Sequence, residues 1–321
     1  MLVAEQIYKT YKAKERTSIF KTKLKYVEAV KGISLKIKRG QVVGLLGVNG
    51  AGKTSTIKML AGIIAPDRGS IVMDDIDVIK NSAKIKVMVN LISGGERNLY
   101  WRLSGRENLK YFGALYNLSK TVLAQRIETL LAIVGLTESA DIAVEKYSKG
   151  MKQRLQIARG LINDPRYIFL DEPTLGLDIL VAKEIRGYIK KLVEQEKKGV
   201  LLTTHYIGEA EELCDYVYII DNGSVIAEGT FSQLKQLIPT ETHTTILLED
   251  NHTDIQSVLK RFIVNGSNPG VNFNDNTITI SDSNIALNDV LSVLSELSVK
   301  IAELKKTDPK LEDVLIHLLK G

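Results

Sequence analysis

The chain of 321 residues contains a single cysteine, Cys214, so no disulfide can form within it. This usage fits a reducing compartment, and Cys214 itself is predicted to be a small buried core residue. No apolar run approaches the roughly 20 residues that a membrane-spanning helix needs. Residues 1–5 also lack the charged-then-apolar layout of a signal peptide. We therefore expect a cytoplasmic protein that does not cross a bilayer by itself.

The net positive charge of the chain is confined to one segment. Its net charge is +5, and residues 12–25 carry six Lys/Arg against one Glu, which is again +5. The remainder is neutral overall, which argues against a nucleic-acid partner. We expect residues 12–25 to be either a solvated loop or a segment that contacts the anionic cytoplasmic membrane surface or another protein.

What is present begins with a glycine-rich stretch, GVNGAGKT, at residues 47–54. The apolar run 42–46 before it predicts a buried strand, and residues 55–60 predict the start of a helix. This strand–loop–helix context and spacing match the Walker A pattern, in which backbone N–H groups cradle phosphates. A chance glycine-rich turn is the alternative, and the flanking elements argue against it. The candidate phosphate-binding residues are Gly47, Asn49, Gly50, Ala51, Gly52, Lys53, Thr54 and Ser55.

Two further strands end in polar side chains. Residues 167–170 are apolar and run into Asp171 and Glu172, while residues 200–204 run into His205. Because the carboxyl ends of parallel strands meet at one edge of a sheet, we expect these side chains to lie opposite the phosphate loop. Asp171 and Thr54 are predicted to hold Mg²⁺, and Glu172 is predicted to activate the attacking water.

The remaining patterns predict the layers around this site. Ile33, Leu35 and Ile37 alternate along a strand. A helical tract begins near residue 104, where Ser104 and Glu107 stand in capping-box spacing, and runs to residue 158. Strands alternating with helices favour a mainly parallel sheet. Beyond residue 240 the composition shifts, with a strand at 276–281, helices at 255–262 and 286–297, and a last helix opening at Asp308. We predict a small α+β domain there.

Three motifs in order carry a resemblance to a known family. Residues 147–154 read YSKGMKQR, residues 171–178 read DEPTLGLD, and His205 follows the next strand. Residues 1 to about 235 thereby resemble the ATP-binding subunits of ABC transporters, of the exporter type with a separate membrane subunit. The resemblance implies an α/β P-loop NTPase fold with a mainly parallel sheet, an antiparallel β subdomain and an inserted helical subdomain. The expected domains are 1–238, with the helical subdomain at about 84–160, and 239–321.

The resemblance also implies a site shared between two copies. Ser148 and Gly150 would bind the γ-phosphate of ATP held by the partner, and Asp178 would contact the partner across a homodimer. His205 would act as the switch histidine. Tyr11 is the expected adenine-stacking residue, and the competing aromatic residues are Tyr8, Phe20 and Tyr26.

The chain departs from the family pattern at three places. Lys149 and Met151 replace the usual Gly and Gln of the signature motif. The loop that normally supplies a glutamine has none, and its expected position falls at or near Gly95. Glu96 is our substitute metal ligand there, because neighbouring glycines would let it turn inward. A surface glutamate in a loop is the alternative.

The sequence therefore predicts an ATPase that uses ATP and Mg²⁺, forms a homodimer, and powers transport through an integral membrane permease. It would work at the inner face of the cell membrane. A soluble ABC ATPase that is not coupled to transport is the alternative from another class. A nucleotide-binding regulator without turnover is a third interpretation, which Glu172 disfavours.

Overall fold

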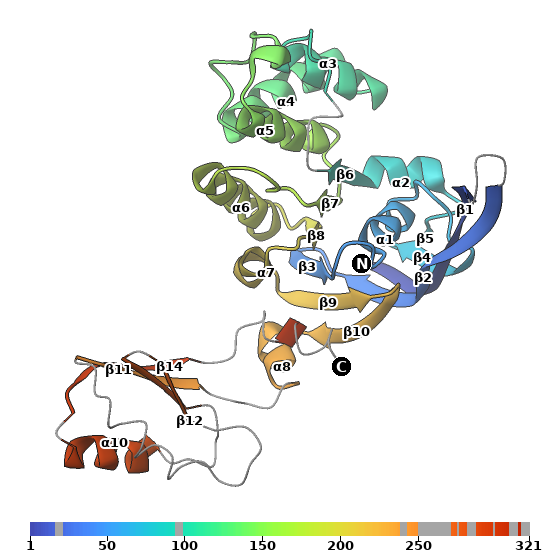
Figure 1. Cartoon of the computed structure of the whole chain (residues 1–321). Coiled ribbons are helices and arrows are strands. Elements are labelled where there is room, and N and C mark those ends of the chain that lie inside the picture. Colours follow the sequence, from blue (N-terminus) through green and yellow to red (C-terminus); the bar gives the residue numbers. More distant parts are fainter. Residues whose placement is uncertain are drawn as a thin grey trace. The chain divides into compact units, whose positions relative to one another are not determined.

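A computed structural model describes residues 1–16, 22–93, 99–237, 243–249, 271–274, 276–280, 287–297, 299–307 and 314–315. The chain divides into two compact units, Met1–Phe231 and Ser232–Gly321 (Figure 1). Within the described residues, no helix is both long enough and apolar enough to span a membrane.

The first unit is built on a six-stranded sheet with the order β10-β9-β3-β8-β7-β6. All neighbouring strands are parallel except β10, which runs antiparallel to β9 at one edge. The predicted mainly parallel sheet is thus confirmed. Its strands are β3 (Gln41–Leu46), β6 (Val89–Ser93), β7 (Tyr167–Asp171), β8 (Gly199–Thr203), β9 (Tyr216–Asp221) and β10 (Ser224–Gly229).

Side chains of this sheet alternate between two apolar layers. Val43 and Leu45 of β3 join the core cluster that contains α1 (Lys53–Leu60). Gly44, between them, faces the other side, where an added Cβ would lie 2.9 Å from Cys214 Sγ. On that side lie α6 (Ile179–Glu194) and α7 (Ile207–Leu213). Cys214 is buried as predicted, and that burial raises the pKa of its thiol.

A second, antiparallel sheet has the order β2-β1-β4-β5 and covers the far side of α1. Ile33, Leu35 and Ile37 are all buried, as their alternation predicts. β1 pairs with β4 only as far as Tyr8, whereas it pairs with β2 out to Arg16 and Thr22. The two long strands therefore project as a hairpin beyond the sheet (Figure 1). The strands are β1 (Leu2–Arg16), β2 (Thr22–Ile37), β4 (Arg68–Met73) and β5 (Ile76–Asp77).

The helices of the inserted subdomain begin at Gly105, beside the start of the helical tract expected near residue 104. Residues near 84 belong to α2 (Ser82–Met88), which leads into the edge strand β6 of the core sheet. A five-residue strand separates α2 from the helices of the subdomain, and the subdomain boundary expected at about residue 84 stays a prediction. Ser104 and Glu107 do form the predicted capping box. The subdomain elements are α3 (Gly105–Leu115), α4 (Lys120–Ile133), the 3₁₀ turn η1 (Val144–Lys146) and α5 (Lys149–Leu161).

The second unit contains an antiparallel sheet with the order β12-β13-β11-β14 and the helix α10 (Leu287–Glu296). Ile246, Ile278, Val290 and Leu294 form its core. The helix expected at 255–262 lies outside the described residues, and of the helix expected after Asp308 only Val314 and Leu315 are described, both in helical conformation. The strands are β11 (His243–Leu248), β12 (Val271–Asn274), β13 (Thr277–Ile280) and β14 (Ile301–Thr307). α8 (Phe231–Lys235) stands at the junction of the two units.

Candidate functional site

The loop between β3 and α1 has a backbone that requires glycine. Gly47 and Gly52 have φ of 156° and 105°. A Cβ would lie 2.2 Å from the Ile220 carbonyl oxygen at Gly47 and 2.4 Å from the Ala29 carbonyl oxygen at Gly52. A side chain at either position would collide with backbone, so the tight curl depends on both glycines. The curl brings backbone N–H groups to the N-terminus of α1, where an anion is favoured.

Lys53, the first residue of α1, is almost fully buried beneath this loop. Its Nζ donates to the carbonyl oxygens of Gly47 at 2.6 Å and Val48 at 3.1 Å. Burial lowers the pKa of Lys53, while the charges of Glu172 and Asp171 oppose that shift. The ammonium therefore lies against the loop and at the cavity, and its contact with phosphate stays a prediction.

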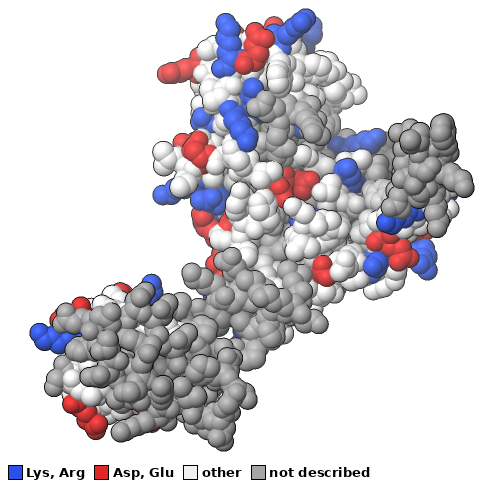
Figure 2. All heavy atoms as spheres, viewed as in Figure 1, with Lys and Arg blue, Asp and Glu red and all other residues white. Residues whose placement is uncertain are grey.

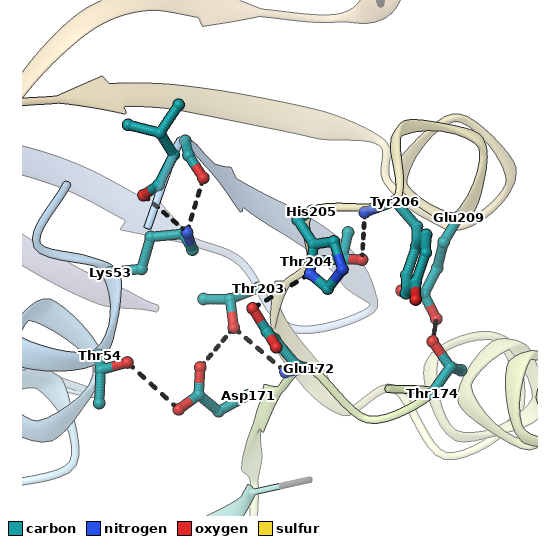
Figure 3. A network of polar contacts seen from close by, with 12 residues as sticks. Lys53, Thr54, Asp171, Glu172, Thr174, Thr203, Thr204, His205, Tyr206 and Glu209 are labelled. Atoms are coloured by element: carbon teal, nitrogen blue, oxygen red, sulfur yellow. Dashed lines mark hydrogen bonds and ion pairs between the residues drawn. The ribbon is translucent and has the colours of Figure 1, made fainter. Parts of the chain in front are cut away.

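Asp171, the last residue of β7, is held between two hydroxyl groups (Figure 3). Its Oδ1 accepts a hydrogen bond of 2.6 Å from Thr203 Oγ1, and its Oδ2 lies 3.4 Å from Thr54 Oγ1. The predicted pair Thr54 and Asp171 is thus brought together. Both are hard oxygen donors, the type that Mg²⁺ prefers, so these residues fit that ion.

Glu172 follows with a φ of 51°, which is unusual for a residue with a side chain. Its backbone N–H donates to the Thr203 carbonyl oxygen at 3.0 Å, which fixes this turn of the chain. Its Oε1 lies 3.2 Å from Nδ1 of His205, which stacks against Tyr206 with ring centroids 4.2 Å apart. A strained backbone of this kind persists when its surroundings hold it, and it points to a functional site.

The phosphate loop, Lys53, Thr54, Asp171 and Glu172 line one cavity of about 350 Å³, whereas His205 is not among its lining residues. Four segments contribute: β2, the phosphate loop with α1, the end of β6, and the loop after β7. Its lining residues are Ala29, Asn49, Gly50, Gly52, Lys53, Thr54, Ser55, Ser93, Asp171, Glu172 and Leu175. Most of the predicted phosphate-binding residues therefore line a single hollow together with both carboxylates.

Ser148 and Gly150 do not line this cavity. Ser148 caps α5, where its hydroxyl accepts a hydrogen bond from the Met151 N–H at 3.2 Å. A Cβ on Gly150 would lie 3.1 Å from the methyl groups of Val181, so glycine allows α5 to approach the start of α6 closely. Asp178 caps α6 in the same manner, accepting from the Val181 N–H at 2.9 Å. Contact of these residues with a partner's nucleotide stays a prediction.

The lysine that replaces a signature glycine has a defined place. A Cβ on Gly176 would lie 2.3 Å from Lys149 Nζ, so the ammonium lies directly against this glycine. Gly176 has a φ of 67° in the loop between β7 and α6. Lys149 thus joins the start of α5 to this loop, and the missing side chain of Gly176 makes room for it.

Tyr11 lies in β1 opposite Val27 of β2, two residues from the cavity-lining Ala29. Two competing aromatic residues are engaged elsewhere. The Arg68 guanidinium lies 4.6 Å from the centre of the Tyr8 ring, and Lys12 Nζ lies 5.9 Å from that of Tyr26. Phe20 lies outside the described residues. Adenine stacking by Tyr11 therefore stays a prediction.

Glu96, the substitute proposed for the missing glutamine, also lies outside the described residues. Ser93, the last described residue before this segment, lines the cavity and pairs with Asp171 between β6 and β7. Sequence reasoning missed both Ser93 and Thr203. The short apolar run before Ser93 was the available signal for the strand β6. For Thr203 the signal was its position two residues before His205.

Comparison with known proteins agrees with this geometry. The ABC transporter family model matches residues 30–175. The chain is 42% identical over 215 residues to the ABC transporter ATP-binding protein NatA of Bacillus subtilis, covering 67% of this chain and 87% of the relative. It is 33% identical to the daunorubicin resistance ATP-binding protein DrrA3 of Streptomyces coeruleorubidus, covering 91% of each.

Solved structures share the fold as well. An ATP-binding subunit of an ABC transporter superimposes with a TM-score of 0.62 at 27% identity, covering 74% of this chain and 92% of that one. An ATP-binding cassette, whose dimeric post-hydrolysis state holds ADP and Pi, gives 0.61 at 25% identity, covering 72% and 98%. The chain therefore belongs to the ATP-binding subunits of ABC transporters and is an ABC transporter ATPase.

Proposed function

We propose that two copies of this chain hold two ATP molecules between them, and that Mg²⁺-dependent hydrolysis drives export through a separate membrane-spanning subunit. The observation that supports turnover, beyond binding, is the approach of Glu172 Oε1 to His205 Nδ1 at 3.2 Å beside the phosphate loop. A loop without a carboxylate to activate water would bind nucleotide and stop there.

Each residue at the cavity has a separate task in this proposal. Lys53 and the loop N–H groups bind the β- and γ-phosphates, and Thr54 and Asp171 hold Mg²⁺, which would neutralise phosphate charge. Glu172 accepts a proton from the attacking water. His205, whose side chain is 41% exposed, contacts the γ-phosphate in this proposal.

Exposed apolar side chains support a dimer formed through the loop after β7. Ile179 and Leu180, directly after Asp178, are 83% and 75% exposed at the start of α6. Leucine and isoleucine side chains next to a charged loop are costly to leave in water and suit burial against a second copy. Ser148 and Asp178, which do not line this chain's own cavity, would then contact the partner.

A groove on the same unit supports contact with the membrane subunit. It has a volume of about 750 Å³ and runs between α2 with β6 and the helical subdomain. Phe112 and Leu115 line it, and Trp101, Tyr100 and Tyr111 nearby are exposed. Aromatic side chains are enriched at protein interfaces. We propose that a segment of the permease binds here.

The names of related chains support the direction of transport. Among the relatives are the Nod factor export ATP-binding protein I of Cupriavidus pinatubonensis, 40% identical over 200 residues, and DrrA3. On this basis we propose export, with the subunit at the inner face of the cell membrane. The hairpin of β1 and β2 would touch the lipid headgroups there, since Leu24, Tyr26 and Val27 are exposed on it beside the basic residues.

The test separates nucleotide binding from turnover. We expect Glu172→Gln to keep ATP affinity and to lose turnover by about 100-fold or more, because the water loses its general base. Lys53→Ala should instead weaken ATP binding itself. ATP affinity is measured by calorimetry and turnover by phosphate release with the purified subunit. Near-normal hydrolysis by Glu172→Gln would contradict the proposed function.

A further inference from the structure

A second contact joins the two catalytic loops, away from Glu172 and His205 (Figure 3). The Thr174 hydroxyl donates a hydrogen bond of 2.8 Å to Glu209 Oε1. Both residues are buried, with exposed fractions of 6% for Thr174 and 5% for Glu209. A buried glutamate is rare without a reason, because removing a carboxylate from water is costly.

The places of these two residues in the chain define what the contact does. Thr174 lies two residues after Glu172, in the loop that leads to Asp178 and α6. Glu209 lies in α7, four residues after His205. The hydrogen bond therefore connects the loop after β7 to the helix after β8. It is separate from the contact between Glu172 and His205 (Figure 3).

One oxygen of the buried Glu209 carboxylate lacks a hydrogen-bond partner. Among the described residues, Glu209 Oε2 has no hydrogen-bond partner although it is buried. The Thr174 hydroxyl is then the one described side chain that compensates this carboxylate. An amide would satisfy Thr174 equally well through its oxygen, and it would leave no unpaired charge.

We infer that Glu209 is a positioning residue for ATP hydrolysis, which holds the loop of residues 173–178 against the His205 loop. Through Thr174 it keeps Glu172 aligned with His205 and sets where Asp178 lies. The inference rests on the proposed roles of Glu172 and His205. In this inference the hydrogen bond between Thr174 and Glu209 positions the loop, and the negative charge of Glu209 is not needed for that role.

The experiment removes the bond from either side and then restores it. We expect Glu209→Ala and Thr174→Val each to lower kcat by about tenfold, the scale of one buried hydrogen bond. KM for ATP should stay within about twofold, because neither residue lines the phosphate cavity. The double variant should be no slower than either single one, since both remove the same contact. Glu209→Gln and Thr174→Ser should keep most of the turnover.

A control variant distinguishes positioning from loss of structure. Leu213 is buried in the same helix α7, so Leu213→Ala should lower the melting temperature without lowering kcat below that temperature. Three results would overturn the inference: Glu209→Gln as slow as Glu209→Ala, additive losses in the double variant, or normal kcat for Glu209→Ala. If Glu172→Gln were also fully active, the proposed function itself would fail. An inactive Glu172→Gln beside an active Glu209→Ala refutes only the inference.

Discussion

A single hydroxyl organises the carboxylates at the end of β7. Thr203 is fully buried at the end of β8, donates to Asp171 Oδ1, and offers its carbonyl oxygen to the Glu172 N–H. It fixes the carboxylate of Asp171 and the backbone of Glu172 together. Thr203 does not line the phosphate cavity, yet it determines the geometry of two residues that do.

Thr203→Val tests this role, because valine has nearly the same shape and lacks the hydroxyl. We expect turnover to fall about tenfold and the Mg²⁺ concentration for half-maximal activity to rise, since Asp171 is no longer held. Thr203→Ser should retain the hydrogen bond and most of the activity. ATPase titrations with Mg²⁺ measure both effects. Superimposable titrations for wild type and Thr203→Val would show that the hydroxyl does not position Asp171.

Sequence reasoning finds such residues only when their partners are close in the chain. Lys53, Thr54 and the glycines of one loop were recognisable together. Thr203 meets Asp171 only because β7 and β8 pair in parallel, with these two residues in register. Glu209 belongs to a sequence run with Glu211 and Glu212 that is typical of a solvated helix face. Its burial depends on the loop that α7 covers.

At the scale of elements, Asp74 joins the antiparallel sheet to the core sheet. Its carboxylate accepts hydrogen bonds from the Tyr167 hydroxyl at 2.7 Å and from Arg166 at 3.0 Å, both at the start of β7. Burial raises the pKa of Asp74, but these bonds and the Met1 amino group outweigh it and lower the pKa to about 2.

This shift predicts a dependence of stability on pH. The folded-state pKa lies below the ordinary value of 3.8, so the contribution is complete above pH 3.8 and is lost as pH falls towards 2. Wild type should exceed Asp74→Asn by about 1–2 kcal/mol in unfolding free energy near pH 7. Urea unfolding from pH 7 to 3 should show that difference shrinking. A difference that stays constant with pH would exclude the linkage.

The projecting hairpin is an element whose extent the sequence did not indicate. Residues 12–25 were expected to be a solvated loop or a segment that contacts the membrane surface or a protein, and β1 and β2 pair through them out to Arg16 and Thr22. On the face of the first unit drawn in Figure 2, the positively charged Lys and Arg side chains lie among the negatively charged Asp and Glu side chains. If the hairpin meets anionic lipid, each cation near the surface should contribute about 1 kcal/mol.

Replacing Lys12, Lys23 and Lys25 by glutamine should therefore weaken binding to acidic vesicles by about 100-fold. The matched control replaces Lys120, Lys146 and Lys183, which changes net charge equally. Sedimentation with vesicles at increasing salt measures the affinity. Equal losses in both variants would show a general charge effect, and no binding by wild type would show that the hairpin is solvated or contacts protein.

At the scale of the whole molecule, the motifs fall into two groups that do not meet within one copy. The Walker A loop, Asp171 and Glu172 share a cavity, while Ser148 and Gly150 lie at the start of α5 and do not line it. The family resemblance of the motifs implied this division. The boundaries of the subdomains were harder to predict, because β6 is short and contains the polar residues Asn90 and Ser93. Its apolar pattern is therefore weak.

The central claim is that each complete ATP site contains the phosphate loop of one copy and the signature of another. The most direct measurement mixes two variants, Lys53→Ala and Ser148→Arg, each inactive by itself. A dimer of one with the other combines an intact loop from the Ser148→Arg copy with an intact signature from the Lys53→Ala copy. We predict that ATPase activity reappears in the mixture. A mixture that stays inactive, although mixed dimers form, would contradict the account.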